Sequence, residues 1–150
     1  MKVIIQRVTK ASVMTHDKCI AKISEGLLIL LGITEDDSKE DIDWLVNKII
    51  NMRIFSDTQG KMNESLKTVD GEILIVSQFT LYASTKKGNR PSFIKAAKPD
   101  VAIPLYHQFL NTFEIQLGKA VAKGKFGADM KVSLINDGPM TIVVDSKNRE

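Results

Sequence analysis

Two short polar groups interrupt apolar segments of this 150-residue chain, and both contain groups that could do chemistry. The first, Ser77-Gln78-Phe79-Thr80, ends the apolar run EILIV. A buried hydroxyl or amide without a hydrogen-bond partner costs about 1–3 kcal/mol. These side chains therefore either cap a strand locally or line a pocket that receives a polar ligand.

The second group, Asn136-Asp137-Gly138-Pro139-Met140-Thr141, separates two β-rich runs near the end of the chain. A Gly-Pro step between strands is ordinary turn chemistry, and about 5–6% of X-Pro bonds in folded proteins are cis. The local pattern alone thus favours a turn.

Other common catalytic patterns do not occur in the sequence. The two histidines, His16 and His107, stand in no HExxH or paired-ligand spacing, which gives metal hydrolysis little support. There is no GxSxG elbow, Walker loop or GxGxxG fingerprint. A Ser-His-Asp triad stays open, because such triads assemble from distant positions. We expect no metal and no cofactor.

The composition is that of an ordinary soluble globular protein, with 43% hydrophobic and 26% charged residues and a net charge of +3. This length favours one domain over residues 1–150. The single cysteine, Cys19, excludes an internal disulfide, and we expect it to be a small buried hydrophobe. The longest apolar stretch, 26–33, is far shorter than a membrane-spanning helix of about 20 residues. Without a signal-peptide pattern, this predicts a cytoplasmic protein without a membrane partner.

Hydrophobic periodicity predicts the elements that must position the polar groups. Three β-rich segments open the chain, at 2–15, 19–24 and 26–33. An amphipathic helix follows, with Ser38 and Asp41 resembling its capping box and the apolar stripe Ile42, Leu45, Val46, Ile49 and Ile50.

The second half of the chain repeats this mixture of strand and helix. We expect a polar loop at 56–71, a buried strand that starts at Glu72 and ends in the first polar group, and a basic loop at 84–91. A second helix starts near Asp100 or just before Pro104. The last strands are then 131–135 and 141–145, separated by a turn.

The two polar groups occur in order with further short motifs, and together they resemble the D-aminoacyl-tRNA deacylase family along essentially the whole chain. The motifs are Gln6-Arg7-Val8, Ala11-Ser12-Val13, Gly26-Leu27-Leu28, Ser77-Gln78-Phe79-Thr80-Leu81, Arg90-Pro91-Ser92-Phe93 and Asn136-Asp137-Gly138-Pro139-Met140-Thr141. Each is weak alone, but the ordered combination is specific. Met140 stands where family members commonly have valine, which is a conservative apolar change.

The resemblance implies an α/β fold of the α+β type, in which β-sheets close into a barrel-like core, two main helices pack outside and two copies form a homodimer. It implies hydrolysis of the ester in D-aminoacyl-tRNA to free tRNA and D-amino acid, which is chiral proofreading in translation.

The resemblance also assigns roles to residues. Ser77, Gln78, Phe79 and Thr80 would bind the 3′-terminal aminoacyl-adenosine, with Phe79 and Thr80 catalytic. Gly138-Pro139, followed by Met140, would be a cis step that reaches across the dimer into the partner's pocket, with Arg7 supporting it.

A rigid backbone carbonyl at the Gly-Pro step would clash with an L side chain and leave a D side chain free, because proline restricts the backbone. Glycine has no side chain to clash. We therefore expect mischarged glycyl-tRNA, such as Gly-tRNA(Ala), to be hydrolysed as well.

Two roles for Thr80 stay open. It could be the nucleophile, although no neighbouring histidine or lysine in the sequence is placed to activate it. Alternatively, the ribose 2′-OH of the substrate assists attack by water, while backbone N–H groups around Phe79 and Thr80 stabilise the oxyanion.

Basic residues could supply the phosphate contacts that a tRNA substrate needs. They are Lys86, Lys87, Arg90, Lys95, Lys98, Lys119, Lys123 and Lys125. Two alternatives to the deacylase remain: a noncatalytic tRNA- or nucleic-acid-binding module of the same fold, and a generic esterase that ignores the tRNA.

Overall fold

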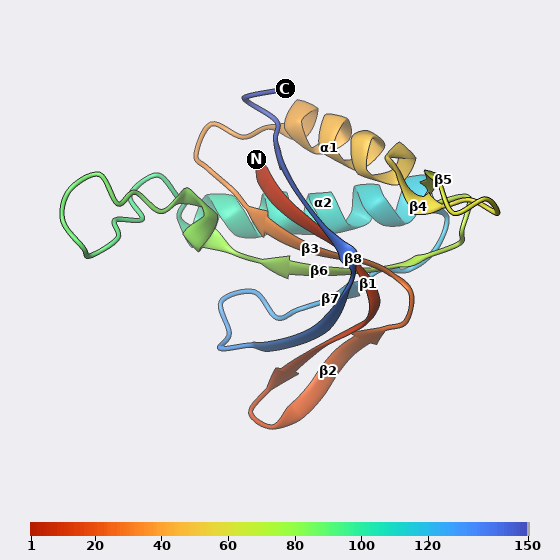
Figure 1. The fold of residues 1–150 in the computed structure, drawn as a ribbon. Coiled ribbons are helices and arrows are strands. Elements are labelled where there is room, and N and C mark those ends of the chain that lie inside the picture. Colours follow the sequence, from red (N-terminus) through yellow and green to blue (C-terminus); the bar gives the residue numbers. More distant parts are fainter. Residues whose placement is uncertain (150) are drawn as a thin grey trace.

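Strand β1 (Lys2–Thr15) pairs with three other strands and organises the main sheet of the structure, a computed structural model that describes residues 1–149. Its first half pairs antiparallel with β3 (Gly26–Gly32), and its second half pairs with β2 (Lys18–Ile23). Strand β8 (Lys131–Asp145) runs antiparallel along its other edge. Because β1 changes neighbours midway, the β1–β2 hairpin bends relative to the first half of β1, and its tip projects from the molecule (Figure 1).

The sheet continues through parallel strands. Strand β6 (Glu72–Ser77) pairs with β3, and the short β7 (Ala122–Lys123) pairs with β6, which gives the order β2-β1-β3-β6-β7. Strand β2 also approaches β6 and β7, so the sheet curls almost into a barrel. The expected mixed α/β fold with a barrel-like sheet is therefore confirmed.

Two hydrophobic cores lie on opposite faces of the sheet. Alternate residues of a strand point to opposite faces. In β3, Leu27, Ile29 and Leu31 belong to the large core beneath the helices, whereas Leu28 belongs to a smaller core inside the curled sheet. Burial on both faces explains why the sequence of β3 is an unbroken apolar run rather than an alternating one.

Both predicted helices form and cover one face of the sheet (Figure 1). Helix α1 (Lys39–Asn51) starts as its capping pattern predicts, because the Asp41 carboxylate accepts a 2.9 Å hydrogen bond from the Ser38 backbone N–H. Helix α2 (Pro99–Leu117) starts near Asp100, the first of the two predicted positions, and Pro104 lies inside it. None of the described helices is long and apolar enough to cross a membrane.

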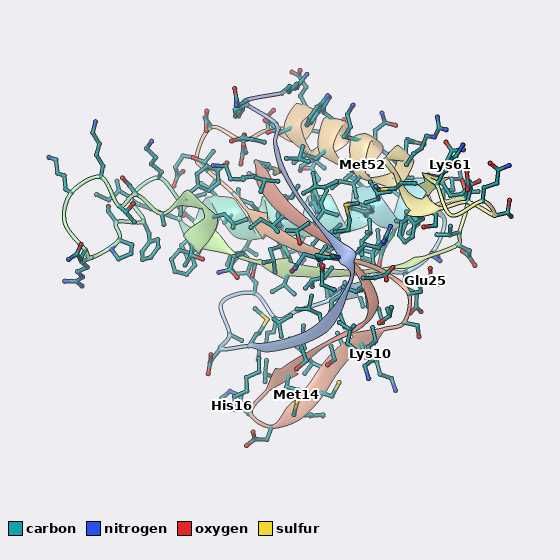
Figure 2. All side chains as sticks on the ribbon, viewed as in Figure 1. Lys10, Met14, His16, Glu25, Met52 and Lys61 are labelled. Atoms are coloured by element: carbon teal, nitrogen blue, oxygen red, sulfur yellow. The ribbon has the colours of Figure 1, made fainter. Side chains whose placement is uncertain are left out.

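The predicted polar loop at 56–71 is partly wrong. Strands β4 (Arg53–Ser56) and β5 (Met62–Ser65) pair antiparallel there as a small separate sheet. Met52 and Lys61 mark this end of the molecule in Figure 2.

The predicted burial of Cys19 is also wrong, because its side chain is exposed. Cys19 pairs with Met14 near the tip of the β1–β2 hairpin. Figure 2 shows Met14 and His16 at this projecting tip. Residues 16–20 at this tip are all exposed, so Cys19 lies on the solvent side of the hairpin.

The final prediction of two strands and a turn needs correction. Residues 131–145 form one strand, β8, whose two halves both pair with β1. The residues between the halves form a bulge in which Arg7 alone stands opposite four residues, 137–140. The Asn136 side chain closes this bulge, because its Oδ1 accepts from the Met140 N–H at 2.9 Å and its Nδ2 donates to the Met140 carbonyl at 3.0 Å.

Candidate active site

The first polar group lies at the carboxyl ends of the parallel strands β3 and β6. Ser77 is the last residue of β6 and pairs with Leu31 of β3. The Gln78 N–H still donates to the Leu31 carbonyl at 2.7 Å, and the chain then leaves the sheet as the 3₁₀ helix η1 (Phe79–Tyr82). The strand thus ends at Ser77, the first residue of the polar group, and the other polar residues lie where the chain turns out of the core.

Gly32 makes this turn possible. A Cβ atom at residue 32 would lie 3.0 Å from the Leu81 Cβ and 3.2 Å from the Gln78 carbonyl oxygen. Glycine at this position therefore lets η1 pack directly on the end of β3 without displacing either atom.

A cavity of about 300 Å³ opens beside this turn, at the lower end of the range for ligand pockets. Ser77, Gln78 and Phe79 form one wall, and the loop at 126–130 forms another, with Asp129 as its acidic residue. The remaining lining is apolar and includes Leu31, Ile33, Val76, Ala97, Ala102 and Val132. The cavity is therefore mainly apolar with a few polar groups in two of its walls, which is typical of a small-ligand site.

Thr80 contacts Gln78 rather than lining the cavity. The Gln78 side-chain amide donates a hydrogen bond to Thr80 Oγ1. An amide is not a base, so this contact orients the hydroxyl without removing its proton. Within the described residues, the backbone N–H groups of Phe79 and Thr80 donate to no protein acceptor.

Phe79 extends from the cavity toward solvent. Its side chain is 57% exposed, and its ring meets the ring of Phe93 edge-on, with centroids 5.1 Å apart. An exposed aromatic pair of this geometry presents ring faces and edges to any ligand in the cavity mouth.

Tyr82, the last residue of η1, is not a base. Burial, together with the nearby Asp37 and Asp145 carboxylates, raises the pKa of the Tyr82 phenol well above its usual value. The phenol stays protonated at physiological pH. Lys2 lies over its ring, with Nζ 5.2 Å from the centroid.

The second polar group lies in the β8 bulge beside Arg7. The Gly138-Pro139 peptide is cis, and Gly138 has φ +124°, a conformation that L side chains rarely adopt. Both residues are exposed, whereas the Met140 side chain packs against the helix-side core. The exposed step is thus available for contact with another molecule.

Arg7, to which the resemblance gives a supporting role, lies against the bulge and makes polar contacts with Ile54 and Asp137. Its Nη1 donates to the Ile54 carbonyl at 2.6 Å, and its Nε forms an ion pair with Asp137 Oδ2 at 3.0 Å, without the alignment of a hydrogen bond. A Cβ on Gly138 would lie 3.0 Å from Arg7 Nη2. Arg7 therefore ties β4 to the bulge and packs against the glycine.

The two polar groups do not meet within one chain. The bulge lies opposite Arg7, which pairs with Leu27, whereas Ser77 pairs with Leu31. Four residues of strand span roughly 13 Å, and three strand spacings add roughly 14 Å across the sheet. A single copy therefore places the Gly-Pro step well away from the cavity.

Sequence reasoning missed several neighbours of these groups. Asn136 and Asp137 belong to the family motif at 136–141, and this motif could have indicated that they contact Met140 and Arg7, respectively. The Ile54 carbonyl and the cavity wall at 126–130 carry no local signal, because only the tertiary structure brings them to the site. No group of three or more potential metal-ligating side chains occurs within residues 1–149.

Known proteins match this chain along nearly its whole length. The family model described as D-Tyr-tRNA(Tyr) deacylase matches residues 4–145. A D-aminoacyl-tRNA deacylase of Flavobacterium psychrophilum is 63% identical over the full length of both chains, and that of Christiangramia forsetii is 64% identical over 99% of each.

Solved structures have the same fold. One, titled c-Myc DNA Unwinding Element Binding Protein, has a TM-score of 0.92 at 40% identity and covers 97% of this chain and 98% of its own. Another, titled as a probable eukaryotic D-amino acid tRNA deacylase, has a TM-score of 0.82 at 20% identity, with 95% and 97% covered. The family match and the full-length relatives show that this chain belongs to the D-Tyr-tRNA(Tyr) deacylase family and is a hydrolase acting on aminoacyl-tRNA.

Proposed function

We propose that this chain hydrolyses the ester of D-aminoacyl-tRNA and rejects the L form, in a site that two copies build together. The observation that carries the proposal is the cavity lined by Ser77, Gln78 and Phe79, at the point where β6 leaves the sheet. This cavity would receive the aminoacyl-adenosine at the 3′ end of the tRNA, and the polar wall would hold the ester carbonyl.

The chemistry needs little from side chains, because an aminoacyl ester is already activated. Developing negative charge on the carbonyl oxygen requires donors that are already oriented. The backbone N–H groups of Phe79 and Thr80 suit this role, since within the described residues they have no protein acceptor. Thr80, in contact with the neutral Gln78 amide, then positions the substrate. The substrate 2′-OH assists the attacking water.

Selection against L-aminoacyl esters would come from the Gly138-Pro139 step of a second copy. The step is exposed and lies roughly 13 Å along the strands from the cavity of its own chain. It can therefore reach a cavity only in a second copy of the chain. A rigid wall beside the substrate Cα excludes an L side chain by contact and does not grip the D side chain. Glycyl-tRNA, including Gly-tRNA(Ala), would pass the same wall.

A deacylation time course on matched D-, L- and glycyl-aminoacyl-tRNA, with EDTA present, tests the proposal. We expect release of the D-amino acid and of glycine, and sparing of the L ester. Equal cleavage of the D and L esters would contradict the steric filter. Cleavage of small activated esters at the same rate as aminoacyl-tRNA would instead favour a generic esterase.

The solved structure named for DNA binding supports one second candidate, a noncatalytic nucleic-acid-binding module. This candidate predicts that the chain binds tRNA and leaves the D-aminoacyl ester intact. The same time course, run beside a tRNA-binding measurement, separates the two. Sedimentation at the assay concentration tests the homodimer, because a monomer that remained active would contradict the shared site.

A further inference from the structure

We propose that the ring of Phe93 stacks on the nucleobase next to the terminal adenosine, and that the loop at 84–92 binds the phosphates that follow it. This inference rests on the proposed function, because it extends the aminoacyl-adenosine cavity outward along the single-stranded end of the tRNA. It assigns substrate contacts to residues outside the cavity.

The first support is the position of Phe93. Phe79 lines the cavity and meets Phe93 edge-on, with ring centroids 5.1 Å apart, whereas Phe93 itself does not line the cavity. The Phe93 side chain is 37% exposed. A nucleotide chain that leaves the cavity past Phe79 therefore meets Phe93 next, and aromatic rings are the usual platforms for unpaired bases.

The second support is the shape of the adjoining loop. Ser84 and Ser92 exchange two backbone hydrogen bonds, of 2.8 and 2.9 Å, which close the base of the loop. Figure 1 shows this green loop projecting from the body of the molecule at the end of the sheet where β6 ends. Phe93 directly follows this closed base, so it lies between the loop and Phe79 in the cavity wall.

The third support is charge. Residues 73–99 contain no aspartate or glutamate, and they carry Lys86, Lys87, Arg90, Lys95 and Lys98. The three loop cations, Lys86, Lys87 and Arg90, are exposed, and no ion pair within residues 1–149 neutralises them. Free cations in a loop whose base adjoins an exposed aromatic pair fit a phosphate backbone with unpaired bases.

A surface for another protein is the competing interpretation, because Ile94 beside Phe93 is 91% exposed. Ile94 provides the matched control. Stacking requires an aromatic ring, so Ile94→Ala leaves nucleic-acid contacts unchanged. A protein interface would depend on this more exposed residue at least as strongly.

The kinetic test compares three substrates that carry the same D-aminoacyl ester: adenosine, a dinucleotide ending in that adenosine, and full tRNA. We expect Phe93→Ala to match the wild type on the adenosine ester and to lower kcat/KM by about 5- to 100-fold on the two longer substrates. Phe93→Trp restores the rate and Phe93→Leu does not, which separates stacking from packing. An equal loss on all three substrates would overturn the proposal, because Phe93 would then act only by supporting Phe79.

The binding test uses an uncharged oligonucleotide with the sequence of the tRNA 3′ end, so it does not depend on hydrolysis. We expect Lys86→Gln/Lys87→Gln/Arg90→Gln to reduce the slope of log affinity against log salt by about 2 to 3. The matched control, Lys10→Gln/Lys18→Gln/Lys22→Gln, changes exposed lysines of the β1–β2 hairpin, where Figure 2 shows Lys10. Equal slopes in the two triple variants would overturn the loop assignment.

Two outcomes separate this inference from the proposed function. If the wild type hydrolyses no D ester but Phe93→Ala still weakens oligonucleotide binding, the proposed function fails and the platform stands. If the wild type hydrolyses every D ester and no Phe93 variant differs from it in rate or binding, the platform fails and the function stands. A change in sedimenting mass for Phe93→Ala or Ile94→Ala would identify a self-association surface and overturn the proposal.

Discussion

Arg7 and Gly138 are in such close contact that a Cβ atom on the glycine would lie 3.0 Å from Arg7 Nη2. The same atom would lie 3.2 Å from the Met140 backbone nitrogen, which has little freedom to move away. The contact joins β1 to the exposed bulge of β8, so the position of the proposed selectivity wall depends on a side chain that is distant in sequence.

We expect Gly138→Ala to destabilise the protein by about 1–3 kcal/mol, because φ +124° disfavours an L side chain and the new methyl group would contact Arg7 and Met140 tightly. Discrimination between D and L esters should fall with it, since the wall must shift. Denaturant unfolding and the D/L time course measure the two effects. Gly60→Ala is the control, because Gly60 also has a positive φ, +76°, but nothing within 4 Å of the added Cβ. Equal effects of the two substitutions would contradict the close contact.

Arg7→Met should cost more stability than loss of its ion pair alone. The substitution removes the hydrogen bond from the guanidinium to the Ile54 carbonyl. It also removes the ion pair with Asp137, whose side chain is 46% exposed. A partly exposed ion pair contributes about 0–1 kcal/mol, whereas a hydrogen bond to a charged group contributes about 1.5–3 kcal/mol. A double-mutant cycle with Asp137→Asn measures the coupling. Coupling as large as the whole effect of Arg7→Met would show that the Ile54 contact adds nothing.

The Asp41 carboxyl makes stability depend on pH. Burial alone would raise the pKa of Asp41, but hydrogen bonds from Ser146, Lys147 and Ser38 outweigh burial and hold the pKa well below its usual value. A depressed pKa stabilises the fold above the unfolded-state value of about 3.9, and this contribution is lost as the pH falls below that value.

We therefore expect Asp41→Asn to have a lower Tm than the wild type at pH 7. Near pH 2 the difference in Tm between the two proteins should be smaller. Thermal unfolding between pH 2 and pH 7 measures this. Asp43→Asn is the control on the same helix, because the Asp43 side chain is 43% exposed and its ion pair is with the exposed Lys39. A difference between Asp41→Asn and wild type that stayed constant with pH would rule out the linkage.

Thr80→Ala should retain activity within about 100-fold of the wild type, because positioning rather than nucleophilic attack is proposed for this hydroxyl. Removal of the 2′-OH from the terminal ribose should cost more. Single-turnover deacylation of ordinary and 2′-deoxy substrates measures both. If Thr80→Ala lost all activity while the wild type still cleaved the 2′-deoxy ester, Thr80 would instead be the nucleophile.

Local patterns determined most of the secondary structure of this protein. Three features depend only on residues close together in the sequence: the unbroken apolar run of β3, the apolar stripe of α1 and the Ser38–Asp41 cap. The strand and the helix could therefore be predicted from the sequence. The ordered motifs likewise indicated the family and both polar groups before any geometry was known.

Tertiary structure alone decided how these groups are placed. Residues 131–145 form one strand because both halves pair with β1. The local Gly-Pro pattern gives no information about this pairing. The cavity exists because the loop at 126–130 meets the ends of β3 and β6. The register of the strands also separates the Gly138-Pro139 step from the cavity of its own chain. This register could not be predicted locally, because the alignment of strands that are distant in sequence depends on how they pack in space.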